Sequence, residues 1–440
     1  MGSYVSITEM EQQELLDAIG VRSLDELYRD VPAQMILKEG ELRLPPGKSE
    51  LEVRESISAY AAQNTRFATV LRGAGSYRHY IPAAVKSVVS REELVTAYTP
   101  YQAEVSQGIL QSIYEYQSMI CQLFGMDVSN ASVYDGCTAA AEAVGMCRDR
   151  RRGKALVSAC ADPQIIETIR TYCFGSGMEV ALVPEKNGHT DADALKELAG
   201  ADTACLYIQQ PNYYGQMEDA EGLGAIIHEA GGKYIMGVNP IACAIMATPG
   251  ECGADIAVGE GQPLGLPAGF GGPYLGIMTA TQAMMRKLPG RIVGKTSDHD
   301  GNVGYVLTLT AREQHIRREK ASSNICSNEA LCALTAAVYL SAMGAKGLTE
   351  AAEQSMAKAH YLAGLLAEAG LPLQYEGEYF HEFVTVCGPE QGQAILDALA
   401  QKGILGGLPV DGGLLWCVTE MVSRAKLDET AAIVKEVLAR

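Results

Sequence analysis

The sequence predicts an α/β protein whose large domain contains a mostly parallel sheet. Three observations carry this prediction: short apolar runs alternate with helical segments between residues 154 and 280, the runs show no polar alternation, and glycine-containing turns separate most of them. Strands of this kind are buried on both faces, as in a parallel sheet that helices cover on each side. A smaller α/β unit follows in the last 95 residues.

Length and composition describe an ordinary globular chain. The 440 residues include 48% hydrophobic and 20% charged residues, and the net charge is −18. Nucleic-acid binding needs a broad basic face, so this charge argues against it. We find no apolar run near the roughly 18 residues of a membrane helix, and the acidic first 20 residues fit neither a secretory signal nor a transit peptide. We therefore expect a cytoplasmic protein with no nucleic-acid or membrane partner.

The twelve cysteines are scattered singly, without a CxxC pair or a close histidine partner. Zinc sites built from cysteine need such spacings, so we expect no metal site. In a chain of this length without a secretory signal, reduced and buried thiols are the ordinary interpretation.

Residues 1–65 read as an extended helical arm, which is too short to form a large core alone. Three pairs with capping-box spacing mark the starts of its helices: Thr8 with Glu11, Ser23 with Glu26, and Ser49 with Glu52. We expect this arm to wrap on another surface.

Residues 66–345 form the expected large domain. Its buried strands are the runs KALVSAC (154–160), EVALVP (179–184), TACLYI (203–208), YIMGV (234–238) and DIAVG (255–259). After the first run, Asp162 and Pro163 fit the N-cap and first position of a helix, which we expect to end near Gly175.

Residues 346–440 form the expected small C-terminal domain. Its elements are a helix near 350–369, a strand near 380–387, a helix near 390–402, a strand near 413–418 and a final helix. Glycines between these elements supply the turns.

Two polar and aromatic segments are candidates for chemistry. The loop 73–82 (GAGSYRHYIP) begins with GxG, but the third glycine of a dinucleotide-binding motif is missing. This loop either presents Tyr77, Arg78, His79 and Tyr80 to a cleft or packs with its aromatic residues half buried. Residues 98–104 (YTPYQAE) combine phenols, an amide and a carboxylate, and either line a pocket or begin a helix.

Residues 135–141 (DGCTAAA) form a turn that enters a helix of small residues. Either the free N–H groups of this helix start hold a phosphate, or Thr138 merely caps the helix. The basic run 148–154 (RDRRRGK) is either a solvated helix end or a docking patch. The second basic run, 312–320 (REQHIRREK), is either an exposed strip or a site for an anionic partner. Between these two runs, the glycine-rich segment 259–276 predicts a long irregular loop.

Together these stretches resemble one known family. The stretches are YTPYQAEVSQGILQSIYEYQSMICQLFGMDVSNASVYDG, the GAGSYRHYIP loop and REQHIRREKASSNIC. They are similar to the alpha subunit (subunit 1) of split glycine dehydrogenase (decarboxylating), the P-protein of the glycine cleavage system. The resemblance runs from the first helix to the last.

The resemblance implies the aspartate-aminotransferase-like fold of pyridoxal-phosphate (PLP) transferases, fold type I, with a seven-stranded, mostly parallel sheet in the large domain and a small C-terminal α/β domain. It implies decarboxylation of glycine, with PLP as electron sink, and transfer of the aminomethyl group to the lipoyl arm of H-protein. Alpha and beta subunits share this work, and we expect an α2β2 assembly.

Within this resemblance, two groups that hold PLP are absent from their expected positions. The cofactor lysine should precede the glycine-rich loop, where this chain has Gln262 and no lysine between Lys233 and Lys287. The aspartate that pairs with the pyridinium nitrogen should follow YIMGV, where Asn239 stands. We therefore expect the beta subunit to bind PLP and this chain to bind none.

The resemblance gives this chain no catalytic residue of its own. It is expected to add structure and walls to the partner's active-site channel, and the candidate wall residues are Tyr98, Tyr101, Gln102 and Glu104, followed by Tyr77 and His79. The basic runs are candidates for docking H-protein. Two alternatives stay open: a scaffold that only stabilises the beta subunit, and a self-sufficient PLP-dependent decarboxylase or transaminase whose lysine comes from elsewhere in the chain.

Overall fold

The chain folds as two units, Met1–Arg66 and Phe67–Arg440. The structure, a computed structural model, describes residues 6–38, 41–269 and 271–439. The predicted domain limits, 1–65, 66–345 and 346–440, stay a prediction.

The first unit contains α1 (Glu9–Ile19), η1 (Leu24–Tyr28), η2 (Ala33–Met35) and α2 (Glu50–Ala62). Thr8 and Ser49 form the predicted capping boxes. The third predicted capping box is wrong, because Ser23 precedes the short 3₁₀ helix η1 and makes no side-chain cap hydrogen bond. The residues after Ser23 form a single 3₁₀ helix, whose tighter turns do not have the geometry of an α-helix capping box.

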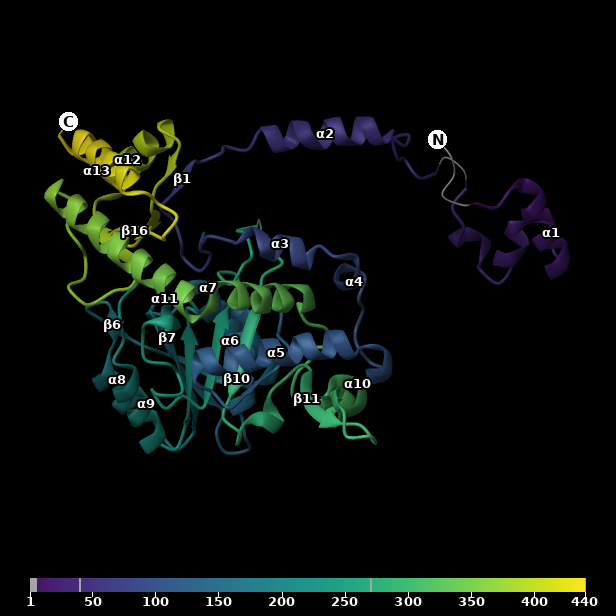
Figure 1. Ribbon diagram of the computed structural model, residues 1–440, viewed down its shortest axis with the longest axis horizontal. Helices are drawn as coiled ribbons and strands as arrows, with labels where there is room; N and C mark the ends of the chain where they lie inside the picture. Colours follow the sequence, from purple (N-terminus) through teal and green to yellow (C-terminus); the bar gives the residue numbers. More distant parts are fainter. Residues whose placement is uncertain (1–5, 39–40, 270, 440) are drawn as a thin grey trace. The chain divides into compact units, whose positions relative to one another are not determined.

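The second unit, in which Figure 1 labels β7 and β10, is built on a seven-stranded sheet. The order of its strands is β2-β10-β9-β8-β7-β3-β4. Strands β9, β8, β7, β3 and β4 are parallel, whereas β10 is antiparallel to both of its neighbours. The strands are β2 (Val128–Ser129), β3 (Lys154–Ser158), β4 (Glu179–Val183), β7 (Thr203–Gln210), β8 (Lys233–Val238), β9 (Ile256–Glu260) and β10 (Gly276–Ala280). The five predicted strands and the mostly parallel sheet are confirmed.

Helices cover both faces of this sheet, and successive strand residues enter two different cores. Leu156 packs in the core that includes residues of α5 (Gln107–Phe124), whereas Ala155 and Val157 pack with α6 (Gly136–Cys147) and α7 (Pro163–Ser176). This alternation follows from the period of two in a strand. The α5 face also receives residues of α3 (Ala83–Val89), α8 (Ala192–Leu198) and α9 (Ala220–Glu229).

The boundaries of α7 match the sequence prediction at one end. Asp162 is its N-cap and Pro163 its first residue, as predicted. Its C-cap is Gly177, two residues beyond the expected Gly175.

The longest helix is α11 (Ala330–Glu368), which connects the large sheet with the C-terminal part (Figure 1). Gly344 interrupts it with φ 61° and ψ 177°, a conformation that favours glycine. By length and composition this helix could cross a membrane, contrary to the expectation that no apolar run is long enough. Its buried residues nevertheless pack in two cores of the protein, and it contacts α5, α3 and α13. A core helix of a globular protein has these properties.

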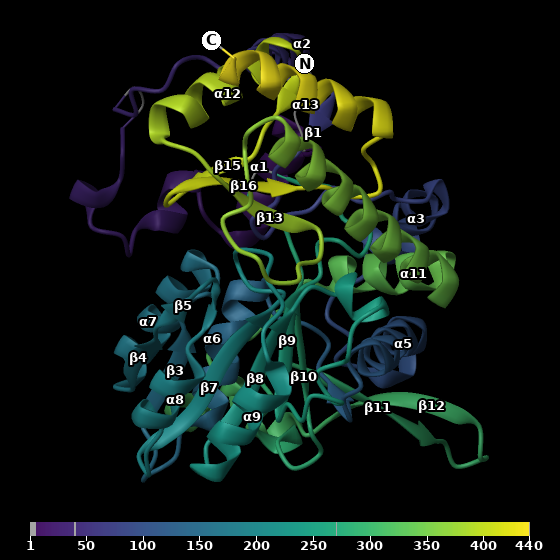
Figure 2. The ribbon, with the colours of Figure 1, turned by 90° about the vertical axis from the view of Figure 1, so that its left-hand side faces the viewer.

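The C-terminal part carries a three-stranded antiparallel sheet of order β13-β16-β15, which α12 and α13 cover (Figure 2). Its elements are β13 (Glu382–Val386), α12 (Pro389–Gln401), β15 (Leu408–Val410), β16 (Gly413–Cys417) and α13 (Arg424–Leu438). The predicted helices and strands are confirmed, and the predicted helix near 350–369 is the second half of α11. The two-residue strand β1 (Thr69–Val70) pairs with β14 (Ile404–Leu405), which brings the start of the loop 73–82 to this part.

Shorter elements complete the second unit. They are α4 (Glu92–Val95), η3 (Ala103–Val105), β5 (Glu185–Lys186), β6 (His189–Thr190), η4 (Ala242–Ala244), η5 (Met285–Lys287), β11 (Ile292–Ser297), β12 (Val303–Thr308), η6 (Thr310–Arg312), α10 (Gln314–Arg317) and η7 (Arg318–Lys320). Strands β11 and β12 form an antiparallel hairpin.

Candidate functional site

A cavity of about 490 Å³ lies at the carboxyl ends of the parallel strands of the large sheet. Ligands of open α/β sheets bind at this edge. The walls come from the loop 74–77, the start of α6, and the residues that follow β3, β8 and β9. The cavity is therefore the candidate site of this chain.

Acidic side chains dominate the charge of this cavity. Five carboxylates line it, namely Asp135, Asp162, Glu260, Glu329 and Glu382, and the described lining residues include no lysine or arginine. Burial raises the pKa of Glu260 and of Glu382 to about 7, and it raises the pKa of Asp162. Burial is the main cause of each raised pKa, and no lysine or arginine among the described lining residues offsets it.

Two of these carboxylates occupy the start of α6. The Asp135 Oδ1 accepts a hydrogen bond from the Thr138 N–H at 2.7 Å, and the Glu260 Oε2 accepts one from the Gly136 N–H at 2.9 Å. The interpretation of Thr138 as the cap is wrong, because the helix begins earlier and Asp135 is its N-cap. A phosphate at this helix start would meet both carboxylates.

The side-chain amide of Gln262 forms hydrogen bonds with backbone groups of Tyr77 and Leu266. Its Oε1 accepts a hydrogen bond from the Tyr77 N–H at 2.8 Å, and its Nε2 donates to the carbonyls of Tyr77 at 2.9 Å and Leu266 at 2.8 Å. Gln262 is only 1% exposed. It therefore ties the loop 74–77 to the turn that follows β9.

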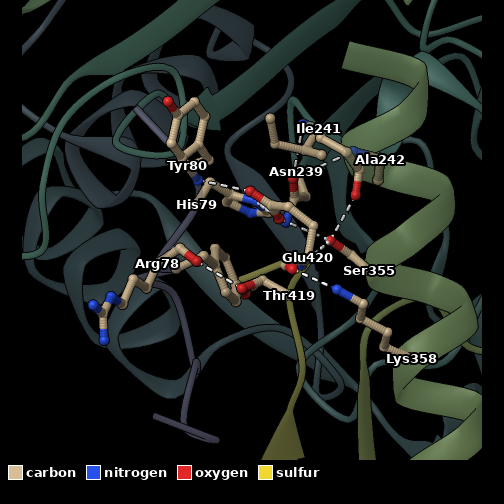
Figure 3. A network of polar contacts seen from close by, with 12 residues as sticks. Arg78, His79, Tyr80, Asn239, Ile241, Ala242, Ser355, Lys358, Thr419 and Glu420 are labelled. Carbon is tan, nitrogen blue, oxygen red and sulfur yellow. Dashed lines mark hydrogen bonds and ion pairs between the residues drawn. The ribbon is translucent and has the colours of Figure 1, made fainter. Parts of the chain in front are cut away.

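Asn239 follows β8 and lines the cavity. Its Oδ1 accepts hydrogen bonds from the N–H groups of Ile241 at 2.9 Å and Ala242 at 3.3 Å, which starts the turn η4 (Figure 3). Its Nδ2 has no hydrogen-bond partner among the described residues. The amide oxygen of Asn239 thus stabilises the turn η4.

Tyr77 and Glu382 meet in the wall of the cavity. The Tyr77 hydroxyl donates to the Glu382 Oε2 at 2.7 Å, and the Ala74 N–H donates to the Glu382 Oε1 at 2.7 Å. Burial and the nearby Glu382 carboxylate hold the pKa of Tyr77 well above its usual range. Tyr77 is therefore buried and also lines the cavity, so both alternatives predicted for the loop 73–82 apply at this residue.

His79 lies in a polar network that joins the same loop to α11 and the C-terminal part (Figure 3). The His79 Nδ1 is 2.7 Å from the Glu420 Oε2, and the Glu420 Oε1 accepts a hydrogen bond from the Tyr80 N–H at 2.7 Å. The Ser355 hydroxyl donates to the same carboxylate at 3.2 Å, and the Lys358 Nζ donates to the Glu420 carbonyl. Burial opposes ionisation of Glu420, but the His79 contact and the backbone hydrogen bonds outweigh it and lower its pKa.

The other four candidate wall residues lie on the surface, away from this cavity. Tyr98 is 84% exposed and Tyr101 is 62% exposed, and Gln102 and Glu104 are also exposed. The Arg291 guanidinium carbon lies 5.7 Å from the centre of the Tyr101 ring. The structure therefore separates the six candidates into an exposed group at 98–104 and a buried pair, of which Tyr77 lines the cavity.

The sequence interpretation missed the acidic lining of the cavity. Glu260 directly follows the predicted strand 255–259 and is the last residue of β9, so its position at the carboxyl edge of the sheet was a usable signal. Glu382 and Glu420 had no such signal, because each contacts the loop 73–82 from more than 300 residues along the chain.

The comparisons with known proteins agree on one family. The family model "Glycine cleavage system P-protein" matches residues 2–434. A curated protein of Moorella thermoacetica, "Probable glycine dehydrogenase (decarboxylating) subunit 1", is 47% identical and is aligned over 99% of this chain and 100% of its own length. The protein of the same name from Chlorobium chlorochromatii is also 47% identical, over 98% of each chain.

Solved structures extend this result to the fold. A crystal structure of glycine decarboxylase (P-protein) of the glycine cleavage system, in inhibitor-bound form, matches with a TM-score of 0.93 and 38% identity over 99% of this chain and 100% of that chain. An aspartate aminotransferase of Thermus thermophilus, at 16% identity and a TM-score of 0.58 over 84% and 99%, shares the fold alone. The predicted PLP-dependent transferase fold of type I is thereby confirmed. The chain belongs to the glycine cleavage system P-protein family, as a relative of its subunit 1.

Proposed function

We propose that this chain is the subunit of a two-subunit glycine decarboxylase that does not bind PLP, while the other subunit does. The curated relatives carry the name subunit 1, which implies a second subunit. The observation that carries the proposal is Gln262, whose amide stands where the family resemblance expects the cofactor lysine and is fully hydrogen-bonded within the chain. An amide cannot form the covalent bond that such a lysine makes with PLP.

The chemistry of the cavity supports this proposal. PLP carries a phosphate and a pyridine ring, and when bound it supplies the electron sink for decarboxylation. The described residues that line the cavity offer five carboxylates and no lysine or arginine to such an anion. Asn239, a neutral amide, cannot supply the negative charge that keeps a pyridinium nitrogen protonated. The donor set therefore does not fit PLP, and we derive no step through it in this chain.

The exposed group at 98–104 supports a role toward the partner subunit. Tyr98, Tyr101 and Val105, which is 79% exposed, place large apolar surfaces in contact with solvent. Aromatic side chains are enriched in protein interfaces, and exposed apolar patches are frequently covered by partners. We infer that Tyr98, Tyr101, Gln102 and Glu104 form part of the wall of the partner's active-site channel.

The helical arm offers a second surface to the partner. Within the unit Met1–Arg66, Leu16 is the one described residue that is buried. Many of its large apolar side chains are exposed, namely Ile7, Met10, Leu15, Ile19, Leu24, Leu27, Tyr28, Val31, Met35, Ile36, Leu37, Leu42, Leu44, Leu51, Val53, Ile57 and Tyr60. Since this apolar surface is costly in water, we infer that the arm wraps on the partner in an α2β2 assembly.

The basic runs divide into structural and exposed members. The Arg152 guanidinium donates to the carbonyls of Thr203 and Ala230, and that of Arg312 donates to the carbonyls of Leu288 and Gly290. Six cationic side chains of the two runs are exposed, namely Arg148, Arg150, Arg151, Arg317, Arg318 and Lys320. We propose these exposed cations as docking points for the lipoyl-bearing H-protein.

All twelve cysteines are free thiols, which fits the cytoplasm that we expect for this protein.

Reconstitution tests this function. Glycine-dependent CO₂ release is measured with the full chain alone, with its subunit 2 alone, and with both together. We expect activity in the mixture and none with this chain alone. Glycine decarboxylation by the isolated chain would instead support the self-sufficient enzyme.

A further inference from the structure

Glu260 connects three separate backbone segments at the edge of the cavity. Its Oε2 accepts the hydrogen bond from the Gly136 N–H at 2.9 Å. Its Oε1 accepts hydrogen bonds from the Gln262 N–H at 2.8 Å and the Leu275 N–H at 3.0 Å. One carboxylate thus satisfies donors from the start of α6, the turn after β9 and the residue before β10.

The contact between Glu260 and α6 is also sterically close. A Cβ atom added at Gly136 would lie 2.9 Å from the Glu260 Cβ and 3.1 Å from its Cα. Only glycine allows this approach of the helix start to the end of β9. The carboxylate is therefore held at the helix start by local geometry as well as by hydrogen bonds.

Backbone N–H groups at a helix start attract anions, and a phosphate is a common occupant. Here the attracted anion belongs to the chain itself. We propose that Glu260 is a specificity-determining residue that keeps phosphate esters, PLP included, out of this chain by occupying the anion position at the start of α6. This inference deepens the proposed function and rests on it.

A phosphate group and the Glu260 carboxylate would compete for the same backbone N–H group at the start of α6. A phosphate that approaches the Gly136 N–H must displace the Glu260 carboxylate, which breaks three charge-assisted hydrogen bonds, or lie beside it at like-charge distance. Asp135, which caps the same helix start, adds a second negative charge. The Gln262 side chain removes the covalent attachment of PLP, whereas Glu260 occupies the phosphate position, so the two residues oppose different parts of the cofactor.

The test uses the full-length chain and inorganic phosphate as the probe. Glu260→Ala empties the anion position, and Glu260→Gln keeps the shape but removes the charge. Glu142 supplies the matched control: it is a buried carboxyl on the same helix with a pKa also raised to about 7, but it lies in the body of α6. Thermal unfolding and isothermal titration are measured in phosphate and in chloride at equal ionic strength and at about pH 8.5, above the pKa of about 7 of Glu260, so that the wild-type carboxyl group is ionised.

For the wild type, the unfolding temperature in phosphate should equal that in chloride. The same should hold for Glu142→Gln. Both Glu260 variants should be stabilised by phosphate in a saturable way and should bind it at least about tenfold more tightly than the wild type. A purely structural role would lower the unfolding temperature equally in both salts. If Glu260→Ala does not fold, Glu260→Gln decides alone.

Two results would overturn the inference: phosphate binding by the wild type as tight as by Glu260→Gln, or no gain of phosphate binding in a folded Glu260 variant. PLP binding by the wild-type chain, followed by its absorbance, separates the two proposals. If the wild type binds PLP, the proposed function fails together with this inference. If the wild type binds no PLP and the variants gain no phosphate affinity, only the role of Glu260 fails.

Discussion

The side-chain amide of Gln262 pairs with both backbone groups of Tyr77, accepting from its N–H at 2.8 Å and donating to its carbonyl at 2.9 Å. Such two-way pairing resembles a step of a β-ladder and fixes the position of the loop. The residue that stands at the expected lysine position is therefore a structural link between the loop 74–77 and the turn after β9.

Replacing Gln262 with Ala should destabilise the chain without removing PLP from the complex. The change leaves the buried backbone groups of Tyr77 without partners, which costs about 2 kcal/mol of unfolding free energy. Denaturant unfolding measures this loss, and the exposed Gln393→Ala serves as a control that should change it by less than about 0.5 kcal/mol. If the complex with Gln262→Ala lost its PLP absorbance, the structural interpretation of Gln262 would be wrong.

Replacing Tyr98 or Glu104 with Ala should lower turnover of the assembled enzyme and leave the chain's own stability within about 0.5 kcal/mol. Both side chains are exposed in this chain, so they contribute little to its core. The measurements are glycine-dependent CO₂ release and thermal unfolding. Phe174→Ala is the matched control, because Phe174 is an aromatic residue 90% exposed on α7. Full turnover in both wall variants, with the complex intact, would favour the scaffold alternative.

Glu142 should make the stability of the chain fall as the pH rises. Burial raises its pKa from 4.5 to about 7, so the folded state binds its proton more tightly than the unfolded state does. This contribution is complete below about pH 4.5 and is lost as the pH rises through about 7. As the pH rises across this window, the unfolding free energy of the wild type should therefore fall relative to that of Glu142→Gln by up to about 3 kcal/mol. Parallel curves for the two proteins would contradict the shift.

The Glu420 carboxylate should stabilise the chain at neutral pH. Its pKa is lowered in the folded state, so its contribution is complete above about pH 4.5 and disappears as the pH falls through the folded pKa. Glu420→Gln should cost about 1 to 3 kcal/mol at pH 7 and less in acid. Glu93→Gln, which breaks the exposed Arg91–Glu93 pair, should lower the free energy of unfolding far less, because solvent screens this pair. Equal losses in the two variants would exclude a special role for the His79–Glu420 contact.

The strands were predictable because each is a short apolar run whose own sequence indicates a strand buried on both faces. KALVSAC and TACLYI are apolar without alternation, and both become inner strands of the parallel part of the sheet. Strands β14 and β15 were not predicted, because Leu408–Val410 contains a proline and both strands are two or three residues long. Their pairing is decided by tertiary contacts.

The candidate site was predictable only in part. Gln262 and Asn239 follow predicted strands, so their position at the carboxyl edge follows from the order of a parallel sheet. The partners of Tyr77 and His79 come from the C-terminal part, and no local pattern indicates that Glu382 and Glu420 contact the loop 73–82. Long-range pairing of this kind needs the structure.

If PLP resides on the partner subunit, as we propose, the cofactor can be trapped on the chain that binds it. The assembled complex is reduced with borohydride, which converts the imine between a lysine and PLP into a stable phosphopyridoxyl-lysine, and each chain is then weighed and mapped by mass spectrometry. We expect the phosphopyridoxyl mass on a lysine of subunit 2 and an unmodified mass for this chain. A phosphopyridoxyl group on any lysine of this chain would contradict this division of work.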